Sequence, residues 1–305
     1  MILRPVRDSA EDAEAVRVVT AAALAPAQTG GNPCGGRPPH GGHLPQADGW
    51  PPERVARHHR ATRHLARTDP GGCWLAEDPT DGSPIGAAQA VRREGTWGLP
   101  LLAVVPRARR GGVGSALLAR ALAYGNGCLR GVAAGSRHPA AARLYRRAGL
   151  DVHPAMRLTG IMDPARLAAP DGPVIEGGSA HRDLLDSVDR RLRGGAHGAD
   201  HGVLLRENRL LVCDDLAGSG YCYLTPDGRV ELLAATSRRL ATRLLTAALL
   251  CLPAGARAEV PCLTAEQQWA LDVGFAAGLE LGPGGYLCLR GMRPPTPYIP
   301  SATYL

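Results

Sequence analysis

A glycine-rich turn between a predicted strand and a predicted helix is the segment whose residue types best suit chemistry. Residues 104–118 supply the strand end, the turn and the helix start in direct succession. Glycines let the backbone N–H groups of a turn point at one anion, because no Cβ atom stands in the way. The helix start adds roughly half a positive charge. With Arg109 and Arg110 as two further cations, this segment predicts a phosphate site.

Two common phosphate-binding motifs do not fit this turn. A P-loop needs Gly-Lys-Ser/Thr, and the chain has no lysine, since all 35 basic side chains are arginine. A dinucleotide-binding fold needs the turn after the first strand of a parallel sheet, whereas three predicted strands joined by tight turns precede this one. The turn therefore belongs to another class of phosphate site.

The order of residues in this turn resembles a known family. Leu-x-Val-x-Pro at residues 102–106, followed by Arg109-x-x-Gly112-x-Gly114, is similar to the pyrophosphate-binding motif of the GCN5-related N-acetyltransferase (GNAT) superfamily. The order and separation of this motif and a second one make the resemblance specific.

The second motif covers residues 138–150 and resembles the GNAT signature of a short helix with Leu-Tyr. His138 replaces the usual Asn, and Leu150 replaces the usual Phe. The resemblance covers nearly all of residues 1–162. The whole chain is similar to actinobacterial tandem GNAT proteins, with a degenerate second copy.

The resemblance implies acetyl-CoA as the acyl donor and co-substrate. The backbone at Val104 and Val105 would bind the pantetheine arm, and one of these two N–H groups would stabilise the tetrahedral oxyanion. The implied cofactor-binding residues lie in both motifs: Val104, Val105, Arg109, Arg110, Gly111, Gly112, Val113, Gly114, Ser115 and His138.

Tyr145 is implied as the catalytic acid, which would protonate the departing thiolate. A phenol with a pKa of about 10 can donate a proton to a thiolate whose conjugate acid has a pKa of about 8.5 once both are desolvated. A tyrosine at helical spacing with Ala141, Leu144 and Ala148 is also a frequent core residue with a satisfied hydroxyl. Both interpretations stand on the sequence.

No residue stands out as the base that deprotonates the incoming ammonium. Glu94, His138 and His153 are candidates by residue type only, and a water chain is an equal alternative. The remaining histidine candidates fit a solvated helix face better than a catalytic array: His58, His59 and His64.

The eight cysteines are spread singly without CxxC spacing, which is typical of free buried thiols in a reducing compartment. Cys34, His40 and His43 match no common zinc spacing, so we expect no metal site. The arginines are scattered among acids, and the net charge of +7 therefore does not indicate a nucleic-acid partner. No uncharged apolar stretch approaches 18 residues, which argues against a membrane span. We expect a cytoplasmic protein of unknown oligomeric state.

Hydrophobic periodicity and turn residues predict a mixed α/β unit in the first half, in which helices cover a mixed sheet. Residues 28–50 are rich in Gly, Pro and His and are expected to be irregular. The expected elements are a strand at 1–5, helices at 9–23 and 52–67, strands at 73–77, 85–93 and 97–105, a helix from 113, a strand at 129–134, a helix at 139–148, and a final strand pair ending near 162.

A chain of 305 residues favours two domains. The expected order is a catalytic GNAT domain at 1–163, a linker at 164–173, a degenerate GNAT-like domain at 174–293 and a Pro-rich tail at 294–305. An internal match places Gln267 at the position of His138 and Gly274 at that of Tyr145. We therefore expect the second half to be structural and to bind no acyl-CoA productively.

The sequence indicates an acetyl-CoA-dependent N-acetyltransferase that acts on a primary amine of a small molecule or peptide. The alternative from another class is a CoA-binding pseudoenzyme or partner-binding module without turnover. A third possibility is that the second half carries the reaction. The sequence does not choose among amine acceptors.

Overall fold

A computed structural model describes residues 1–25 and 49–305. These residues form two compact units: unit 1 comprises residues 1–89 and 102–124, and unit 2 comprises residues 90–101 and 125–305. The predicted irregular segment, with Cys34, His40 and His43, lies outside the described residues except for its last two positions. Within the described ranges, no helix is both long enough and apolar enough to cross a membrane.

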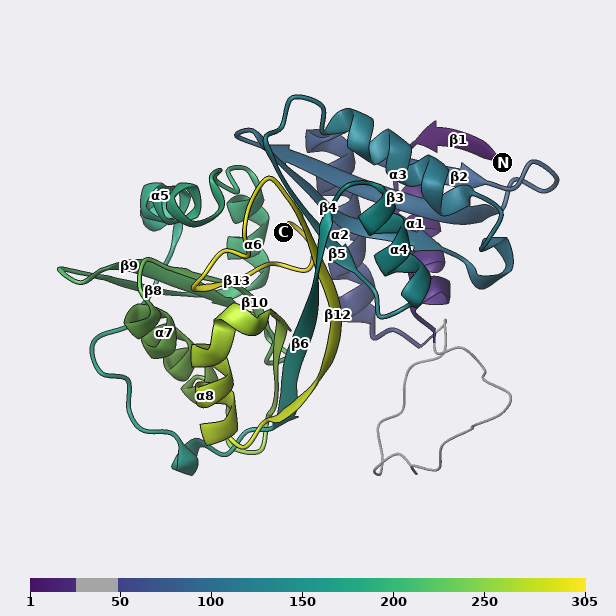
Figure 1. The fold of residues 1–305 in the computed structure, drawn as a ribbon. Helices are drawn as coiled ribbons and strands as arrows, with labels where there is room; N and C mark the ends of the chain where they lie inside the picture. Colours follow the sequence, from purple (N-terminus) through teal and green to yellow (C-terminus); the bar gives the residue numbers. More distant parts are fainter. Residues whose placement is uncertain (26–48) are drawn as a thin grey trace. The chain divides into compact units, whose positions relative to one another are not determined.

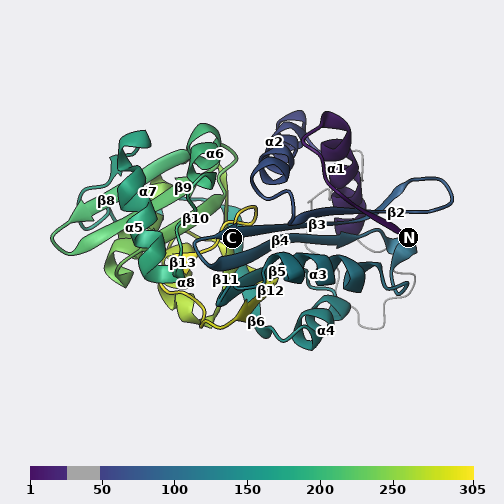
Figure 2. The same cartoon turned by 90° about the horizontal axis from the view of Figure 1, so that it is seen from above.

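Unit 1 contains three α-helices and a small antiparallel sheet. Strand β1 pairs with β2, and β2 pairs with β3. Helices α1 and α2 lie side by side (Figures 1 and 2). The elements that lie in or enter this unit are β1 (Ile2–Pro5), α1 (Ala10–Leu24), α2 (Pro52–Thr68), β2 (Cys73–Glu77), β3 (Pro84–Arg93), β4 (Thr96–Val104), η1 (Pro106–Ala108) and α3 (Val113–Tyr124).

Helix α3, which follows the glycine-rich turn, packs very closely on β3 at Gly86. A Cβ atom on Gly86 would lie 2.8 Å from side-chain atoms of both Val113 and Leu117. Both of these side chains are buried. The glycine thus lets the first turn of α3 approach the sheet, and this contact fixes the position of the turn before it.

Unit 2 contains two sheets. In the larger one, residues 96–99 of β4 pair in parallel with residues 130–133 of β5, and the remaining pairs are antiparallel: β5 with β12, β12 with β6, and β6 with β11. The smaller sheet has the order β13-β10-β9-β8-β7.

The elements of unit 2 after β4 are β5 (Arg130–Gly135), α4 (Pro139–Arg147), β6 (Asp151–Ile161), η2 (Pro164–Arg166), β7 (Ile175–Glu176), η3 (Ser179–His181), α5 (Arg182–Arg193), α6 (Asp200–Glu207), β8 (Arg209–Asp215), β9 (Gly218–Leu224), β10 (Val230–Ala235), α7 (Arg238–Leu250), β11 (Arg257–Leu263), η4 (Ala265–Gln267), α8 (Gln268–Ala276), β12 (Glu280–Arg290) and β13 (Tyr298–Ile299).

The two halves of the chain exchange strands within the larger sheet. Strand β12, from the second half, lies between β5 and β6, and its Leu287 pairs with Ala134 on one side and His153 on the other. Strand β6, from the first half, lies between β12 and β11. Figure 1 shows β6 and β12 side by side. Each half therefore completes the sheet of the other.

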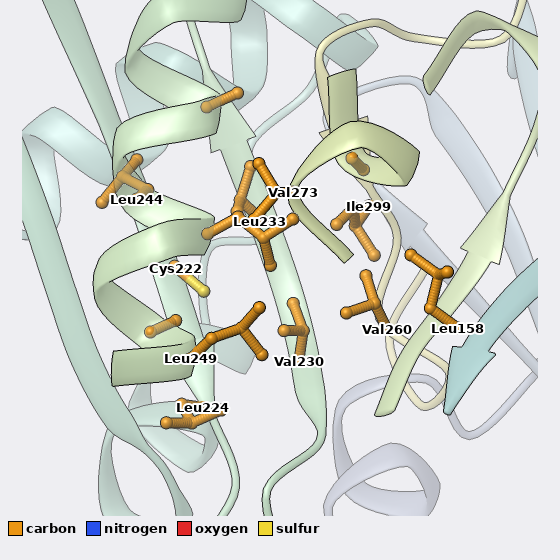
Figure 3. Close-up of a cluster of buried hydrophobic side chains, with 14 of the residues drawn as sticks. Leu158, Cys222, Leu224, Val230, Leu233, Leu244, Leu249, Val260, Val273 and Ile299 are labelled. Carbon is orange, nitrogen blue, oxygen red and sulfur yellow. The ribbon is translucent and has the colours of Figure 1, made fainter. Parts of the chain in front are cut away.

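The core between α7, α8 and the strands of the second half is apolar and fully enclosed. Leu233 of β10, Leu244 of α7 and Val260 of β11 are each 0% exposed. Figure 3 shows these side chains packed with Leu158 of β6, so the strand from the first half forms one wall of this core.

Most predicted elements are confirmed, with ends that differ by one or two residues. The predicted strand pair ending near residue 162 is wrong, because a single strand, β6, covers that stretch and finds its partners in the second half. Pro154 does not break it. Strand β11 pairs with β6 only from Met156 onward, so Pro154 faces one neighbouring strand and its missing N–H costs little. The seven cysteines among the described residues are free thiols, as predicted.

Candidate functional site

The glycine-rich turn of unit 1 presents a row of unpaired backbone N–H groups. The N–H groups of residues 111–115 donate to no acceptor among the described residues, whereas Ala116 N–H donates to Gly112 O at 3.0 Å. Gly111, Gly112 and Ser115 are exposed. Arg110 and Gly112 have left-handed backbones, with φ of 66° and 82°. A turn of this kind followed by a helix start is suited to grip an anion.

Two contacts next to the turn bear on the predicted roles of its neighbours. Val105 N–H donates to Ile85 O at 3.0 Å, so that N–H is not free to stabilise an oxyanion. The carbonyl of Val104 accepts a hydrogen bond from Arg109 Nε at 3.2 Å. Of the two predicted amide donors, the N–H of Val105 is thus already used by strand β3.

Arg109 fastens the turn to its surroundings. Besides Val104 O, its guanidinium donates from Nη2 to Ala23 O at 2.9 Å, in the last turn of α1. Both acceptors are neutral carbonyls, and no carboxylate of the described residues pairs with Arg109. Its charge therefore stays available to an anion at the turn, and its contacts also position the turn.

His138 and Tyr145 belong to unit 2, on either end of α4. His138 is exposed and caps the helix, with Nδ1 accepting from Ala140 N–H at 3.1 Å. Tyr145 is buried, and its hydroxyl donates to Ala134 O at 3.2 Å. The predicted turn residues thus lie together in unit 1, and His138 and Tyr145 lie together in unit 2. A site made of both groups stays a prediction.

The surroundings of Tyr145 change the argument about its acidity. Burial, with a smaller contribution from Cys288 of β12, raises its pKa well above the ordinary value. The ring lies against β5, since a Cβ on Gly135 would be 3.3 Å from it. The phenol is therefore a weaker acid here than the free side chain, and it stays protonated throughout the neutral range.

Two candidate bases are engaged elsewhere. Glu94 forms two hydrogen bonds with Arg190, at 2.7 and 2.8 Å, and accepts a third from Ala196 N–H. These partners, Arg190 foremost, lower the pKa of Glu94 to about 2, so it is a poor base. His59 Nε2 lies 2.8 Å from Glu14 of α1.

The histidines of α2 are not a solvated face, and that interpretation is wrong. His64 is buried, and burial lowers the pKa of His58 to about 4. The His58 ring meets Trp50 edge-on at 5.4 Å, and its Nδ1 has no partner among the described residues. His58 and His59 lie close to charged side chains of α1, which packs against α2.

We expect the free energy of unfolding to fall as the pH drops from about 6.5 to about 4. The unfolded chain takes up a proton on His58 in that range and the folded chain does not, so acid favours unfolding by up to roughly 3 kcal/mol. Denaturant titrations across this range should show a flatter pH dependence in His58→Gln. His59→Gln, one residue away, should keep most of the slope, because burial is the largest cause of the lowered His58 pKa and the charge of His59 is a smaller one. An unchanged slope in His58→Gln would show that another group causes it.

A buried polar network in the second half was missed from the sequence. Asp189 Oδ2 accepts from His197 Nδ1 at 2.7 Å, from His197 N–H at 3.0 Å and from His201 Nε2 at 3.1 Å, and Oδ1 accepts from the hydroxyl of Tyr221. Burial alone would raise the pKa of Asp189, but the two histidines hold it well below its usual range. The sequence does contain His197 and His201 four residues apart, which is the one local sign of this network.

Within residues 1–25 and 49–305, Asp189, His197 and His201 are the one group whose ligand atoms lie close enough together to hold a metal ion. Asp189 Oδ2 is, however, already hydrogen-bonded to His197 Nδ1 and His201 Nε2, although His197 Nε2 has no hydrogen-bond partner among the described residues. His201 Nδ1 is also used, by the hydroxyl of Tyr223 at 3.1 Å. A hydrogen-bond network that stabilises the interior accounts for this cluster without a metal.

Both the glycine-rich turn and α4 lie in a segment that matches one family model. Residues 69–149 match the model of the acetyltransferase (GNAT) domain. A mycothiol acetyltransferase of Clavibacter michiganensis subsp. michiganensis (strain NCPPB 382) is 36% identical over 137 residues. This match covers 44% of the present chain and 44% of the relative, so it spans less than half the length of either protein.

Solved structures resemble the chain over its whole length. A putative acetyltransferase from Pyrococcus horikoshii has a TM-score of 0.74 at 18% identity, covering 100% of this chain and 95% of that one. A tandem GNAT protein from the clavulanic acid biosynthesis pathway has a TM-score of 0.57 at 16% identity, covering 96% and 99%. At these identities the likeness concerns the fold, and the predicted α/β GNAT fold is confirmed.

Proposed function

We propose that this chain, a member of the GNAT superfamily by its acetyltransferase domain at residues 69–149, transfers an acetyl group from acetyl-CoA to a primary amine. The unpaired N–H groups of residues 111–115 carry the proposal. They lie at the first turn of α3, where the helix dipole favours a diphosphate, and Arg109 adds an unneutralised charge. The residues present therefore fit the diphosphate of CoA.

The chain's own groups have distinct tasks in such a transfer. When bound, acetyl-CoA supplies the thioester carbonyl carbon, to which the amine nitrogen bonds as the C–S bond breaks. The turn N–H groups hold the diphosphate, and the backbone at Val104 orients the pantetheine arm. We assign to Tyr145 the proton that the departing sulfur needs, and the proton of the ammonium goes to a base or to water.

The raised pKa of Tyr145 specifies how this residue can act. A phenol that stays protonated can donate a hydrogen bond to a developing thiolate at any pH of an ordinary assay. Complete proton transfer is uphill in the ligand-free environment, because a phenol is a weaker acid than a thiol even at its ordinary pKa, and burial widens the difference. We therefore assign to Tyr145 stabilisation of the thiolate by hydrogen bonding, with transfer following as sulfur leaves.

Tyr145→Phe is expected to lower kcat by about 10²- to 10⁴-fold, the usual contribution of a positioned acid. The affinity for CoA should change little, because the phenol is not among the groups assigned to the diphosphate. Release of free thiol from acetyl-CoA with a panel of amines measures the first quantity, and calorimetric titration with CoA measures the second. Full activity in the variant would remove Tyr145 from the mechanism while leaving the cofactor assignment intact.

A CoA-binding protein without turnover is the second candidate. Two observations favour it: the Tyr145 hydroxyl already donates to Ala134 O, and Arg190 neutralises the candidate base Glu94. Tight CoA binding with no thiol release across the amine panel would select this candidate. Turnover with any amine would reject it.

One relative supports a broad class of amine acceptor but no specific acceptor. The match to a mycothiol acetyltransferase supports an amine carried by a small molecule, and a peptide amine is the other acceptor class to test. We further propose that residues 1–163 hold the catalytic domain, that residues 164–173 link it to a degenerate GNAT-like domain at 174–293, and that the protein acts in the cytoplasm.

A further inference from the structure

Residues 297–299, in the C-terminal segment of residues 295–305, run along one edge of β10 in the second half. Their strand β13 pairs antiparallel with β10, through Ile299 with Leu233 and Tyr298 with Ala234. Ala235 N–H also donates to Pro297 O at 3.4 Å. The other edge of β10 pairs with β9, so the segment takes the one edge that β9 leaves open.

This edge of β10 corresponds to the edge of β4 at which pantetheine is proposed to bind. The order β10, α7, β11 repeats the order β4, α3, β5. Strands β4 and β5 share parallel pairs from Thr96 and Arg130 to Leu99 and Ala133. By contrast, the one bridge found here among the described residues joins Glu259 of β11 to Arg229, the residue just before β10. Beyond that bridge, the partner of β10 is β13.

The side chain of Gln267 hydrogen-bonds to backbone groups of residues 295–305. An amide side chain could bind the amide groups of pantetheine in the same way. Its Nε2 donates to Pro295 O at 2.8 Å, and its Oε1 accepts from Tyr298 N–H at 3.3 Å. Trp269 Nε1 donates to the same Oε1 at 2.9 Å and fixes its orientation. Gln267 occupies the position that matches His138, which instead caps its own helix in the first half.

The segment is buried as a core element is. Ile299 is 0% exposed, and Figure 3 shows it among Leu233, Val260 and Val273. The buried Ser301 donates from Oγ to Glu231 of β10 at 2.6 Å. Leu305 packs with Val132, Leu287 and Leu289 on the larger sheet.

The helix start after β10 differs from that after β4. Ser237 caps α7, with Oγ accepting from Leu240 N–H at 3.4 Å, and α7 begins directly at Arg238 without a glycine-rich turn. The row of free N–H groups found before α3 is therefore not repeated, and no comparable site for a diphosphate exists here.

We propose that residues 295–305 act as a permanently bound intramolecular ligand of the second half. They occupy the strand edge of β10 that corresponds to the proposed pantetheine-binding edge of β4 in the first half. The second half thus binds a peptide of its own chain and not a second acyl-CoA. This inference rests on the proposed function only where β10 is compared with β4. The contacts of the segment with β10, Gln267 and Glu231 are independent of it.

The test cuts the segment free after folding. A protease site inserted after the exposed Arg293 lets the full chain fold first, and cleavage then leaves residues 294–305 held without a covalent link. The cleaved peptide is expected to stay bound during gel filtration and to exchange with a labelled synthetic copy. Gln267→Ala should speed its release at least tenfold. Gln268→Ala, at the exposed neighbouring position, should not.

Titration of the uncleaved chain with CoA separates this proposal from the proposed function. One CoA per chain, with the peptide retained after cleavage, supports both. No CoA binding with the peptide retained defeats the proposed function and leaves the resident peptide supported. Two CoA molecules per chain, or a cleaved peptide that leaves at once in the unsubstituted protein, overturns the proposal about residues 295–305.

Discussion

Replacing Gly112 with aspartate is expected to weaken CoA binding by at least about a hundredfold and to remove acetyl transfer. The carboxylate would stand among the N–H groups of residues 111–115 and repel the diphosphate. Two unit charges about 4 Å apart at a protein surface interact by roughly 4 kcal/mol, and a hundredfold change needs only about 2.7 kcal/mol. Calorimetric titration with CoA and thiol release from acetyl-CoA measure the two effects.

Two controls separate charge from backbone strain in this experiment. Gly112→Asn has nearly the same shape and tolerates the left-handed backbone equally, so it should lose far less affinity than Gly112→Asp. Gly82→Asp imposes the same strain at another exposed turn, where φ is 71° and nothing lies within 4 Å of the added Cβ. It should leave CoA binding unchanged. Unchanged activity in Gly112→Asp would place the reaction elsewhere, with the second half as the first place to look.

The glycine-rich turn and α4 could be predicted because the signals are local. A glycine at φ 82° and a helix cap at His138 depend on residues a few positions away. The acidity of Tyr145 could not be predicted in the same way. It depends on burial against β5 and on Cys288, which lies far along the chain. The ordinary pKa of a phenol, used in the sequence analysis, therefore overestimated the acidity of Tyr145.

The pairing partners of the strands were the other feature that local sequence patterns could not predict. The alternation in residues 151–161 predicts a strand, but nothing in it says that the neighbours are β12 and β11. The network of Asp189, His197, His201 and Tyr221 was missed for the same reason, since it joins two helices, a loop and a strand. Long-range contacts decide both features, and a single sequence shows them only as isolated residues.

Residues 1–168 produced alone are expected to show no cooperative thermal unfolding. Without β12, strands β5 and β6 lose the strand between them, and the buried Leu287, Cys288 and Leu289 are missing from the sheet. Burying a large aliphatic side chain contributes roughly 1.5–3 kcal/mol, so two leucines and a cysteine approach the 5–15 kcal/mol that holds a whole domain folded. Calorimetry and circular dichroism of the fragment measure the outcome. Co-production with residues 169–305 should restore one cooperative transition.

The matched control cuts the same bond after the strands have exchanged. Ala168 and Ala169 are exposed, so a protease site between them can be cleaved in the folded protein. Strands β6 and β12 then stay in each other's sheets, and the two pieces should migrate as one complex with the unfolding temperature nearly unchanged. A fragment of residues 1–168 that unfolds cooperatively and binds CoA as the full chain does would contradict the strand exchange. The sheet requires both halves of the chain if the cleaved protein stays associated and folded while the isolated fragment of residues 1–168 does not fold.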